Sequence, residues 1–323
     1  MYTTDKAGAH ADTERAAKPK IAAIVGPTAS GKSGAAIEAA LRFNGEIVSC
    51  DSMQIYKGMD IGTAKVSASE RALVPHHMTD IVMPCENYSC AQYAHDAEGV
   101  TRDIIARGKL PIFCGGTGQY LDAVLTGNTF SQAGTDEELR ARLNVRDGGE
   151  LWAELERIDP ESAYAVHANN KKRVVRALET YYLTGMTKSE WDRQSRTHEM
   201  PFDALVIGLY FEDRQRLYER INERVDRMFL LGLEDEVRRL DGTLGTTARA
   251  AIGYKELTAY LRGECSLDEA REAIKTASRR YAKRQMTWFR SKPYVHPVSA
   301  DGGEESIKSR VFEMIEGFLG GDK

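Results

Sequence analysis

The stretch that decides the fold is Gly26-Pro27-Thr28-Ala29-Ser30-Gly31-Lys32-Ser33. It has the spacing of a phosphate-binding loop, in which two glycines enclose four residues and a lysine and a hydroxyl residue follow. A short apolar run at 21–25 precedes the loop, and an Ala-rich stretch with helical spacing at 34–43 follows it. Because strand, loop and helix are the context that this motif requires, the stretch predicts a site for a diphosphate or larger phosphate ligand.

The residue types in this loop suit an anion. Gly26 and Gly31 allow backbone N–H groups to turn toward a phosphate, and the N-terminus of the following helix adds partial positive charge. Lys32 supplies a point charge, and the Ser33 hydroxyl can hold Mg²⁺ or a phosphate oxygen. We therefore predict Mg²⁺ as cofactor with Ser33 as its ligand, and diphosphate binding by Gly26, Pro27, Thr28, Ala29, Ser30, Gly31, Lys32 and Ser33. The alternative is a glycine-rich turn with a solvated lysine.

Size and composition narrow the class of protein. A chain of 323 residues with 42% hydrophobic residues can bury a large core in one to three domains. No apolar run approaches the roughly 20 residues of a membrane span, so we expect no membrane association. The polar, Ala-rich stretch 1–19 lacks an apolar core and predicts a disordered N-terminal extension. The five cysteines form no CxxC pair, which favours a reducing cytoplasm over a zinc site or a disulfide framework.

Positive charge is concentrated in two segments of a chain whose net charge is −4. Residues 271–292 include eight basic side chains and one acidic one, and residues 171–196 include seven basic and three acidic ones. Such concentration on a mildly acidic protein favours a polyanion lying on one face. Two solvated helix faces would give the same pattern, so charge alone leaves both interpretations open.

The order of predicted elements indicates a parallel sheet. A second strand at 46–50 ends at Asp51, and a third strand at 109–114 ends in the glycine turn 115–118. A helical stretch at 93–107 separates these strands, and helices that alternate with strands cover a parallel sheet on both faces. Ligands of such sheets bind at the carboxyl ends of the strands. We therefore expect the phosphate loop, Asp51 and Thr117 to converge on one crevice.

The character of the chain changes in its middle. Residues 135–196 are helical and charged without a strand candidate, and an apolar strand at 205–211 then returns to the sheet. The rest of the chain is mostly helical. We predict an α/β, P-loop NTPase-like fold, a parallel sheet with helices on both faces and an inserted all-helical domain. The predicted core spans 20–134 and 201–323, and the inserted domain spans 135–200.

Two polar residues at strand ends are candidates for chemistry. Asp51 could hold Mg²⁺ or act as a general base, or it could cap a helix. Thr117 could hydrogen-bond a phosphate or a reacting group, or it could be a plain turn residue. The third strand ends in Cys114-Gly115-Gly116 and lacks the acid that organises Mg²⁺ and water in P-loop NTPases, which weakens the hydrolase interpretation.

Two further groups are less specific. Arg220 and Arg224 are four residues apart on a predicted helix, so they could clamp a diphosphate or lie on a solvated face. His76 and His77 have no metal-ligand spacing, and a structural role is expected for them.

Taken together, the motifs resemble the tRNA isopentenyl transferase family, the bacterial tRNA dimethylallyltransferases. The resemblance covers about residues 20–295, and its specificity comes from the joint order of the motifs. In this order they are GPTASGKS at 26–33, DSMQIY at 51–56, GMDIGTAK at 58–65, PHH at 75–77, GGTGQY at 115–120, RVVRALE at 173–179, IGYKE at 252–256 and YAKRQMTWFR at 281–290.

The resemblance implies transfer of a dimethylallyl group from dimethylallyl diphosphate to the exocyclic N6 amine of the adenosine 3′-adjacent to the anticodon in tRNA, with release of diphosphate. Asp51 matches the proposed base of the family, and Thr117 matches a threonine that affects activity and contacts tRNA. Thr28, Lys32, Ser33 and Mg²⁺ would stabilise the charge that develops on the leaving diphosphate.

The resemblance also implies a tRNA interface. The target adenosine of the anticodon stem-loop is flipped into the crevice, at an unstacking cost of about a few kcal/mol. The basic segments would hold phosphates of the stem. The implied tRNA-binding residues are Asp51, Ser52, Met53, Gln54, Thr117, Arg140, Lys172, Arg173, Val174, Val175 and Arg176.

Departures from the family pattern are few. Asn169-Asn170-Lys171-Lys172 stands where many relatives have Asn-Asp-Pro, and Val66 stands where a proline is usual. No Cys or His cluster follows Cys265, which fits a bacterial member. We expect a monomeric, cytoplasmic enzyme. The alternatives are an adenine-nucleotide prenyl transferase, a P-loop small-molecule kinase and a non-enzymatic RNA-binding protein.

Overall fold

The core of the fold is one parallel sheet. The computed structural model describes residues 18–126, 136–196 and 200–321, so the predicted extension lies almost wholly outside the described residues. Within these ranges six strands pair in parallel in the order β3-β2-β4-β1-β5-β6. The strands are β1 (Lys20–Val25), β2 (Gly45–Ser49), β3 (His76–His77), β4 (Leu110–Gly115), β5 (Asp203–Tyr210) and β6 (Val295–Ser299). The predicted α/β fold is confirmed.

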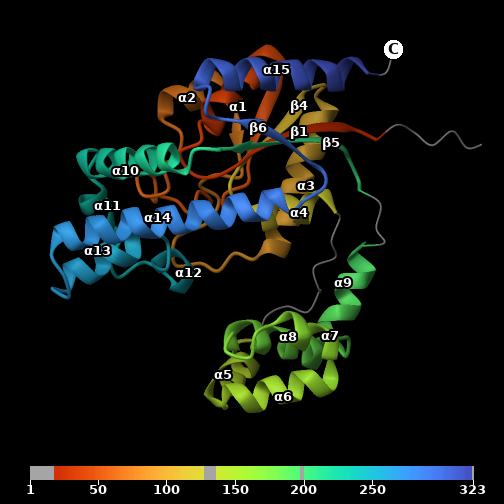
Figure 1. The fold of residues 1–323 in the computed structure, drawn as a ribbon, viewed down its shortest axis with the longest axis vertical. Coiled ribbons are helices and arrows are strands. Elements are labelled where there is room, and N and C mark those ends of the chain that lie inside the picture. The colour runs from red at the N-terminus through yellow and green to blue at the C-terminus, as the bar shows by residue number, and fades with distance from the viewer. Residues whose placement is uncertain (1–17, 127–135, 197–199, 322–323) are drawn as a thin grey trace, which may run out of the picture.

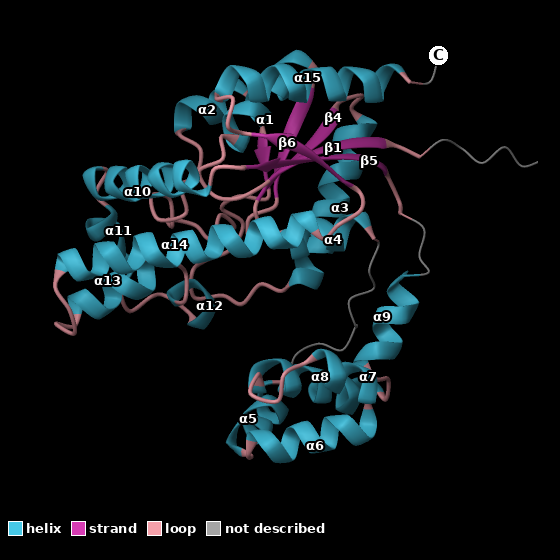
Figure 2. Ribbon diagram, in the orientation of Figure 1, coloured by secondary structure: helices cyan, strands magenta, loops and turns pink. Residues whose placement is uncertain are grey.

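Both faces of the sheet are buried. Along β1, Ile21, Ala23 and Val25 enter one hydrophobic cluster, whereas Ala22 and Ile24 enter another. Successive side chains of a strand point to opposite faces, so an unbroken apolar run is what a doubly covered strand requires. Figure 2 shows the strands enclosed between helices.

The helices on the two faces come from both halves of the core. On one face α1 (Lys32–Arg42) packs against α15 (Glu304–Gly320), and on the other α3 (Cys90–Ala106) packs against α4 (Gly118–Leu125) (Figure 1). The remaining helices of this part are α2 (Ala68–Leu73), α10 (Arg214–Leu230), α11 (Leu233–Leu240), α12 (Thr246–Arg249), α13 (Tyr254–Leu261) and α14 (Leu267–Arg290).

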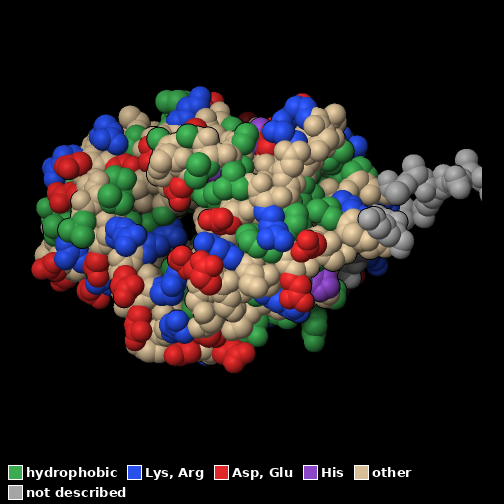
Figure 3. Space-filling model, turned by 90° about the horizontal axis from the view of Figure 1, so that it is seen from above, with side chains coloured by type: hydrophobic (Ala, Val, Ile, Leu, Met, Phe, Trp, Pro, Cys, Tyr) green, Lys and Arg blue, Asp and Glu red, His purple; other side chains and the backbone are tan. Residues whose placement is uncertain are grey.

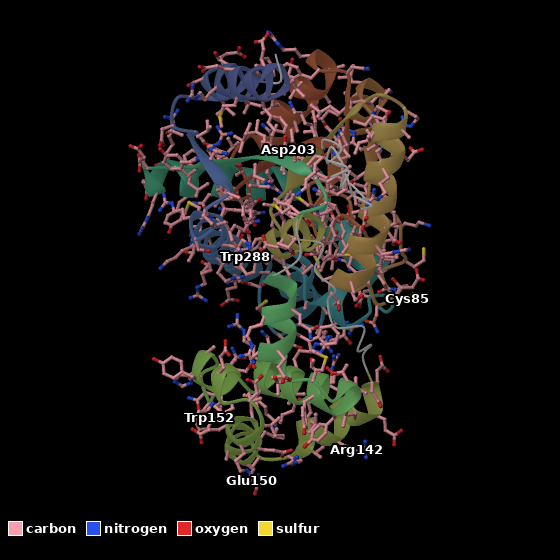
Figure 4. The ribbon with its side chains drawn as sticks, turned by 90° about the vertical axis from the view of Figure 1, so that its right-hand side faces the viewer. Cys85, Arg142, Glu150, Trp152, Asp203 and Trp288 are labelled. Atoms are coloured by element: carbon pink, nitrogen blue, oxygen red, sulfur yellow. The ribbon has the colours of Figure 1, made fainter. Side chains whose placement is uncertain are left out.

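The middle of the chain folds around a separate core. Its helices are α5 (Glu137–Val145), α6 (Gly148–Ile158), α7 (Pro160–Ala165), α8 (Lys171–Thr184) and α9 (Lys188–Arg196). Leu143, Leu151, Leu155 and Leu178 centre a hydrophobic cluster that includes no residue of the sheet. Figure 4 shows this body, with Trp152 and Glu150 labelled, beside the part that contains Trp288. The inserted domain's predicted boundaries fall in or next to ranges outside the described residues and stay predictions.

Two strands were missed by the sequence analysis. The strand β3 is only two residues long, and β6 contains Pro297. Both lie at the edges of the sheet, where proline is tolerated because one side of the strand needs no ladder hydrogen bonds. The prediction of a mostly helical segment after Asp213 therefore overlooked the last strand of the sheet.

The surface mixes both signs of charge. Figure 3 shows cationic and anionic side chains interspersed over one face. On α15, for example, Arg310 pairs with Glu313 at 2.6 Å and Lys308 pairs with Glu305 at 3.3 Å. In the described parts of the chain we find no helix that is long and apolar enough to cross a membrane.

Candidate active site

The phosphate loop joins β1 to α1 in the predicted context. Gly26 has φ 152°, and a Cβ there would lie 2.8 Å from the carbonyl oxygen of Leu209 on β5. Gly31 has φ 87°, a left-handed conformation that favours glycine, directly before α1. The Lys32 Nζ donates to the Pro27 carbonyl at 3.1 Å, so the side chain folds back along its own loop.

A cavity of about 460 Å³ opens beside this loop. Its polar wall includes Thr28, Lys32, Ser33, Asp51, Ser52, Gln54, Thr63, Lys172, Arg224, Tyr281, Arg284 and Gln285. Its apolar wall includes Ile47, Met53, Val66, Ile221, Val225, Met228, Ala250, Ala251, Ile252 and Ile274. The volume is that of a pocket for a small molecule, and the walls suit a ligand with a charged and an apolar end.

The turns after β2 and β4 meet at this cavity. The backbone N–H of Ser52 donates to Thr117 Oγ1 at 3.0 Å, and Thr117 Oγ1 donates to Ser52 Oγ at 3.2 Å. Asp51 Oδ1 accepts from the backbone N–H of Met53 at 2.9 Å, which closes a turn. Asp51 caps no helix among the described residues, and its carboxyl group lines the cavity with Lys32. The structure therefore brings Lys32 and Asp51 to one cavity, while Thr117 is hydrogen-bonded to Ser52 next to Asp51 and is not itself among the lining residues.

The ionisable groups that line the cavity shift one another's pKa values. Enclosure by protein lowers the pKa of Lys32, and Arg224 lowers it further, while Cys114 and Asp51 oppose the shift. Burial also lowers the pKa of Arg224, again against Asp51, and raises that of Cys114 to about 11. Lys32 and Arg224 therefore line the cavity as cations whose charge is disfavoured by desolvation, and an anionic ligand would relieve that cost.

The two arginines of the predicted clamp make different contacts. The Nε of Arg220 donates to the Ala29 carbonyl at 2.9 Å and holds the phosphate loop from outside. Arg224 lines the cavity, whereas Arg220 does not. Arg220 therefore supports the phosphate loop while Arg224 lines the cavity, and binding of a diphosphate by both guanidinium groups stays a prediction.

Three site residues on α14 were missed by the sequence analysis. Gln285 Oε1 accepts from the Thr28 N–H at 2.9 Å, and its Nε2 donates to the Gly116 carbonyl at 3.0 Å, so one side chain ties the phosphate loop to the turn after β4. A Cβ at Gly116 would lie 2.0 Å from that Nε2. Tyr281 and Arg284 line the cavity beside it, and burial, then the charge of Asp51, raises the pKa of Tyr281 to about 12.

The predicted tRNA residues of the inserted domain separate into two groups. Arg140 and Arg176 donate to the same oxygen of the buried Glu179, at 2.7 and 2.8 Å, so α5 and α8 present two cations together. Lys172 lines the cavity and Arg173 is exposed. Val174 and Val175, in contrast, are buried in the helical core, which corrects the prediction that they contact tRNA: their side chains face away from solvent.

The turn residue Gln54 is already engaged. Its Nε2 donates to the carbonyls of Thr63 and Ala64, at 3.2 and 3.3 Å, and its Oε1 accepts from the Ser49 hydroxyl at 3.1 Å. Gln54 thus fixes the neighbouring loop, and a contact with tRNA stays a prediction for it, as it does for Ser52 and Met53.

The neighbouring residues His76 and His77 have different surroundings. His77 Nε2 lies 2.7 Å from a carboxylate oxygen of the buried Glu46, which also accepts from Arg107 and Lys109. The hydrogen bond from Arg107 is the largest cause of the lowered pKa of Glu46, against its burial. The structural role expected for His77 is confirmed, while His76 lines the cavity.

Fold and cavity define a P-loop enzyme whose phosphate loop faces an apolar wall and lacks the third-strand acid of a hydrolase. The chain belongs to the IPP transferase family, whose model matches residues 54–292. Curated relatives carry the name tRNA dimethylallyltransferase. The one from Geobacillus thermodenitrificans is 50% identical over 93% of this chain and 97% of its own. The one from Caldanaerobacter subterraneus is 44% identical over 93% of this chain and 98% of its own.

Solved structures agree with this assignment. The full-length tRNA isopentenylpyrophosphate transferase of Bacillus halodurans is 42% identical, with a TM-score of 0.71 over 94% of this chain and 97% of its own. A eukaryotic dimethylallyltransferase captured acting on tRNA is 29% identical, with a TM-score of 0.82 over 94% of this chain and 80% of its own. The resemblance inferred from the motifs is confirmed.

Proposed function

We propose that this protein transfers a dimethylallyl group from dimethylallyl diphosphate to the N6 amine of the adenosine 3′-adjacent to the anticodon in tRNA. The allylic C–O bond breaks, a C–N bond forms and diphosphate leaves. The observation that carries the proposal is that Lys32 and Asp51 line the same cavity, whose other wall is apolar. That combination fits an alkyl diphosphate and a nucleophile that must lose a proton.

The leaving group is assigned to the phosphate loop. Lys32, Ser33 and Thr28 line one end of the cavity, and Arg224 adds a second cation there. Positive charge placed where charge develops stabilises a transition state more than a ground state. The apolar wall from α10 and α14, including Val225, would take the hydrocarbon end of the donor and exclude water from the allylic carbon.

Mg²⁺ fits this end of the cavity. Ser33 and Asp51 offer the hard oxygen donors that the ion prefers, and no group of three potential metal ligands occurs among the described residues. Mg²⁺ commonly keeps water and binds through one or two protein oxygens together with substrate phosphates. We assign Ser33 as its protein ligand, and when bound the ion would neutralise charge on the diphosphate.

Asp51 is assigned as the base. An aromatic amine is a weak nucleophile, so removal of its proton as the C–N bond forms assists the attack. Asp51 lies between the phosphate loop and the turn of Thr117, whose hydroxyl fixes Ser52. A target base flipped out of the anticodon loop would enter this cavity, where Lys172 and Arg284 also lie. We propose that the protein acts as a monomer in the cytoplasm.

Mass spectrometry of tRNA nucleosides tests the proposal. Incubation of unmodified tRNA with the protein, Mg²⁺ and dimethylallyl diphosphate should add one isopentenyl group to an adenosine. Adenosine monophosphate in place of tRNA should yield no product. Product formed from the mononucleotide alone would favour the nucleotide prenyl transferase, and tight ATP binding without affinity for dimethylallyl diphosphate would favour a kinase.

The lowered pKa of Lys32 predicts how diphosphate binding depends on pH. Diphosphate prefers the protonated lysine, so affinity should be highest below the pKa of the free protein and fall as pH rises through it. Because that pKa is lowered by enclosure, the fall should begin at lower pH than for an ordinary lysine. Isothermal titration with inorganic diphosphate at a series of alkaline pH values measures this fall in affinity. In Lys32→Met the part of the pH dependence that comes from the lysine should be absent.

Exposed cations at the start of α8 predict salt-dependent tRNA binding. Lys172→Ala with Arg173→Ala should weaken binding and reduce the slope of log affinity against log salt by about 1.4–1.8, as expected for two lost phosphate contacts. Arg176 is left intact because it also holds the buried Glu179. Arg157→Ala, an exposed cation on α6 of the same domain but outside the basic segment 171–196, is the control. An unchanged slope in the double variant would remove this segment from the interface.

A further inference from the structure

A buried carboxylate on α11 holds the loop 60–62 by its backbone. Glu236 is 1% exposed. Its Oε2 accepts from the N–H groups of Asp60 and Ile61, at 2.9 and 2.8 Å, and its Oε1 accepts from that of Gly62 at 2.9 Å. It forms no ion pair with any described Lys, Arg or His, so backbone donors replace the usual cationic partner. A carboxylate that accepts several backbone N–H groups holds that stretch of backbone through charge-assisted hydrogen bonds.

A tyrosine completes this arrangement. The hydroxyl of Tyr254, at the start of α13, donates to Glu236 Oε1 at 2.5 Å. Its ring packs on the loop so closely that a Cβ at Gly62 would lie 2.5 Å from Tyr254 Cε2. Tyr254 is fully buried, and burial, then the charge of Glu236, raises its pKa, so it remains a donor. Gly62 of GMDIGTAK and Tyr254 of IGYKE are therefore packed in the same contact.

The held loop is part of the cavity wall. Gly62, whose N–H Glu236 binds, lines the cavity together with the next two residues, Thr63 and Ala64. On its other side this wall is fixed to Gln54, whose amide donates to the carbonyls of Thr63 and Ala64. Gln54 lies three residues after Asp51 in the same turn. A chain of direct contacts therefore runs from Glu236 through the loop to the turn of the proposed base.

We propose that Glu236 is a positioning residue: by holding the backbone of 60–62 it sets the place of one wall of the cavity that takes dimethylallyl diphosphate. This inference rests on the proposed function for the identity of the ligand, but not for the clamp itself. The opposing explanation is that Glu236 only stabilises the fold. That role would reduce the folded fraction and leave the KM of the folded enzyme unchanged.

The test compares Glu236→Gln with Glu234→Gln in the full chain. A glutamine at 236 keeps one acceptor oxygen and places an NH₂ group where the other oxygen was. At least one of the three backbone N–H groups then faces another donor, whereas the Tyr254 hydroxyl can rotate and accept from the NH₂. Glu234 lies on the same helix and forms a partly exposed pair with Arg238 at 2.6 Å, so its glutamine variant controls for loss of a charge. Hydrogen exchange of the amides of 60–62 and steady-state kinetics are measured on each.

In Glu236→Gln we expect faster exchange of these amides and a KM for dimethylallyl diphosphate raised about 10–100-fold, the effect of a misplaced binding wall. The dissociation constant for tRNA should change less than about twofold, and Glu234→Gln should match the unaltered protein. Tyr254→Phe, which keeps the three N–H bonds and the ring, should raise KM less than Glu236→Gln.

Two results would overturn the inference. One is unchanged protection of 60–62 in Glu236→Gln. The other is an unchanged KM in a variant with a lowered melting temperature, which would make Glu236 purely structural. If the unaltered protein transfers no prenyl group, the proposed function fails, while the exchange experiment still decides whether Glu236 clamps the loop. The two failures are therefore distinguishable.

Discussion

Asp51→Ala is expected to lower the turnover of prenyl transfer by about 10²–10⁴-fold, the usual contribution of a general base. The carboxylate lies in the cavity with Lys32 and is the proposed acceptor of the amine proton. Binding of tRNA rests on many other contacts, so its dissociation constant should change little. Single-turnover rates with saturating donor, together with tRNA binding curves, separate the two effects.

Asp51→Asn distinguishes the role of Asp51 as a general base from its role in closing the turn. Asp51 Oδ1 accepts from the Met53 N–H at 2.9 Å, and an asparagine retains an oxygen for that bond but cannot take a proton. The asparagine variant should therefore lose about as much rate as the alanine variant. A much milder loss with asparagine would show that the turn, and not proton transfer, is what Asp51 provides. Equal loss of rate and tRNA affinity in both variants would also contradict its role as a base.

Local patterns explain why the site's centre could be predicted from the sequence. The run at 21–25, the glycines of the loop and Lys32 are contiguous, so the strand, the turn and the helix start each leave a mark within a few residues. Parallel strands then bring Asp51 and Thr117 to the same edge of the sheet without further information. The order of the motifs indicated the family, and the family model, the relatives and the solved structures confirm that assignment.

What could not be predicted depends on contacts between distant residues. Gln285 meets Thr28 across 257 positions, and Glu236 meets Gly62 across 174. Nothing near either residue in the sequence indicates its partner. On α14 the positions 274, 278, 281 and 285 are three or four residues apart and therefore lie on one helix face, the face that lines the cavity. The sequence analysis considered only the basic residues of this segment and did not use that spacing.

Helix periodicity would have prevented one error. Val174, Val175 and Leu178 recur at helical spacing within RVVRALE and form part of the buried helical core. Of the neighbouring cations, Arg173 is exposed and Arg176 is partly exposed. A motif aligned as one tRNA-contact segment therefore combines side chains that hold the domain together with side chains available to a ligand.

Lys32→Met is the second large effect that we expect. Removal of the cation beside the leaving diphosphate should lower kcat/KM for dimethylallyl diphosphate by about 10²–10³-fold, as for loss of one preorganised electrostatic contact in a transition state. Methionine is similar in length and keeps the packing along the Pro27 carbonyl. Lys57→Met, at an exposed position outside the cavity wall, is the control and should retain its activity.

The stability of Lys32→Met gives an independent check on this interpretation. Enclosure lowers the pKa of Lys32, which means that the empty cavity disfavours its charge. Removal of a cation held at such a cost should leave the melting temperature unchanged or raise it, although activity falls. A lysine with a structural role would instead lose stability and activity together. Loss of rate in a protein that melts no earlier would show that the charge of Lys32 is kept for the diphosphate.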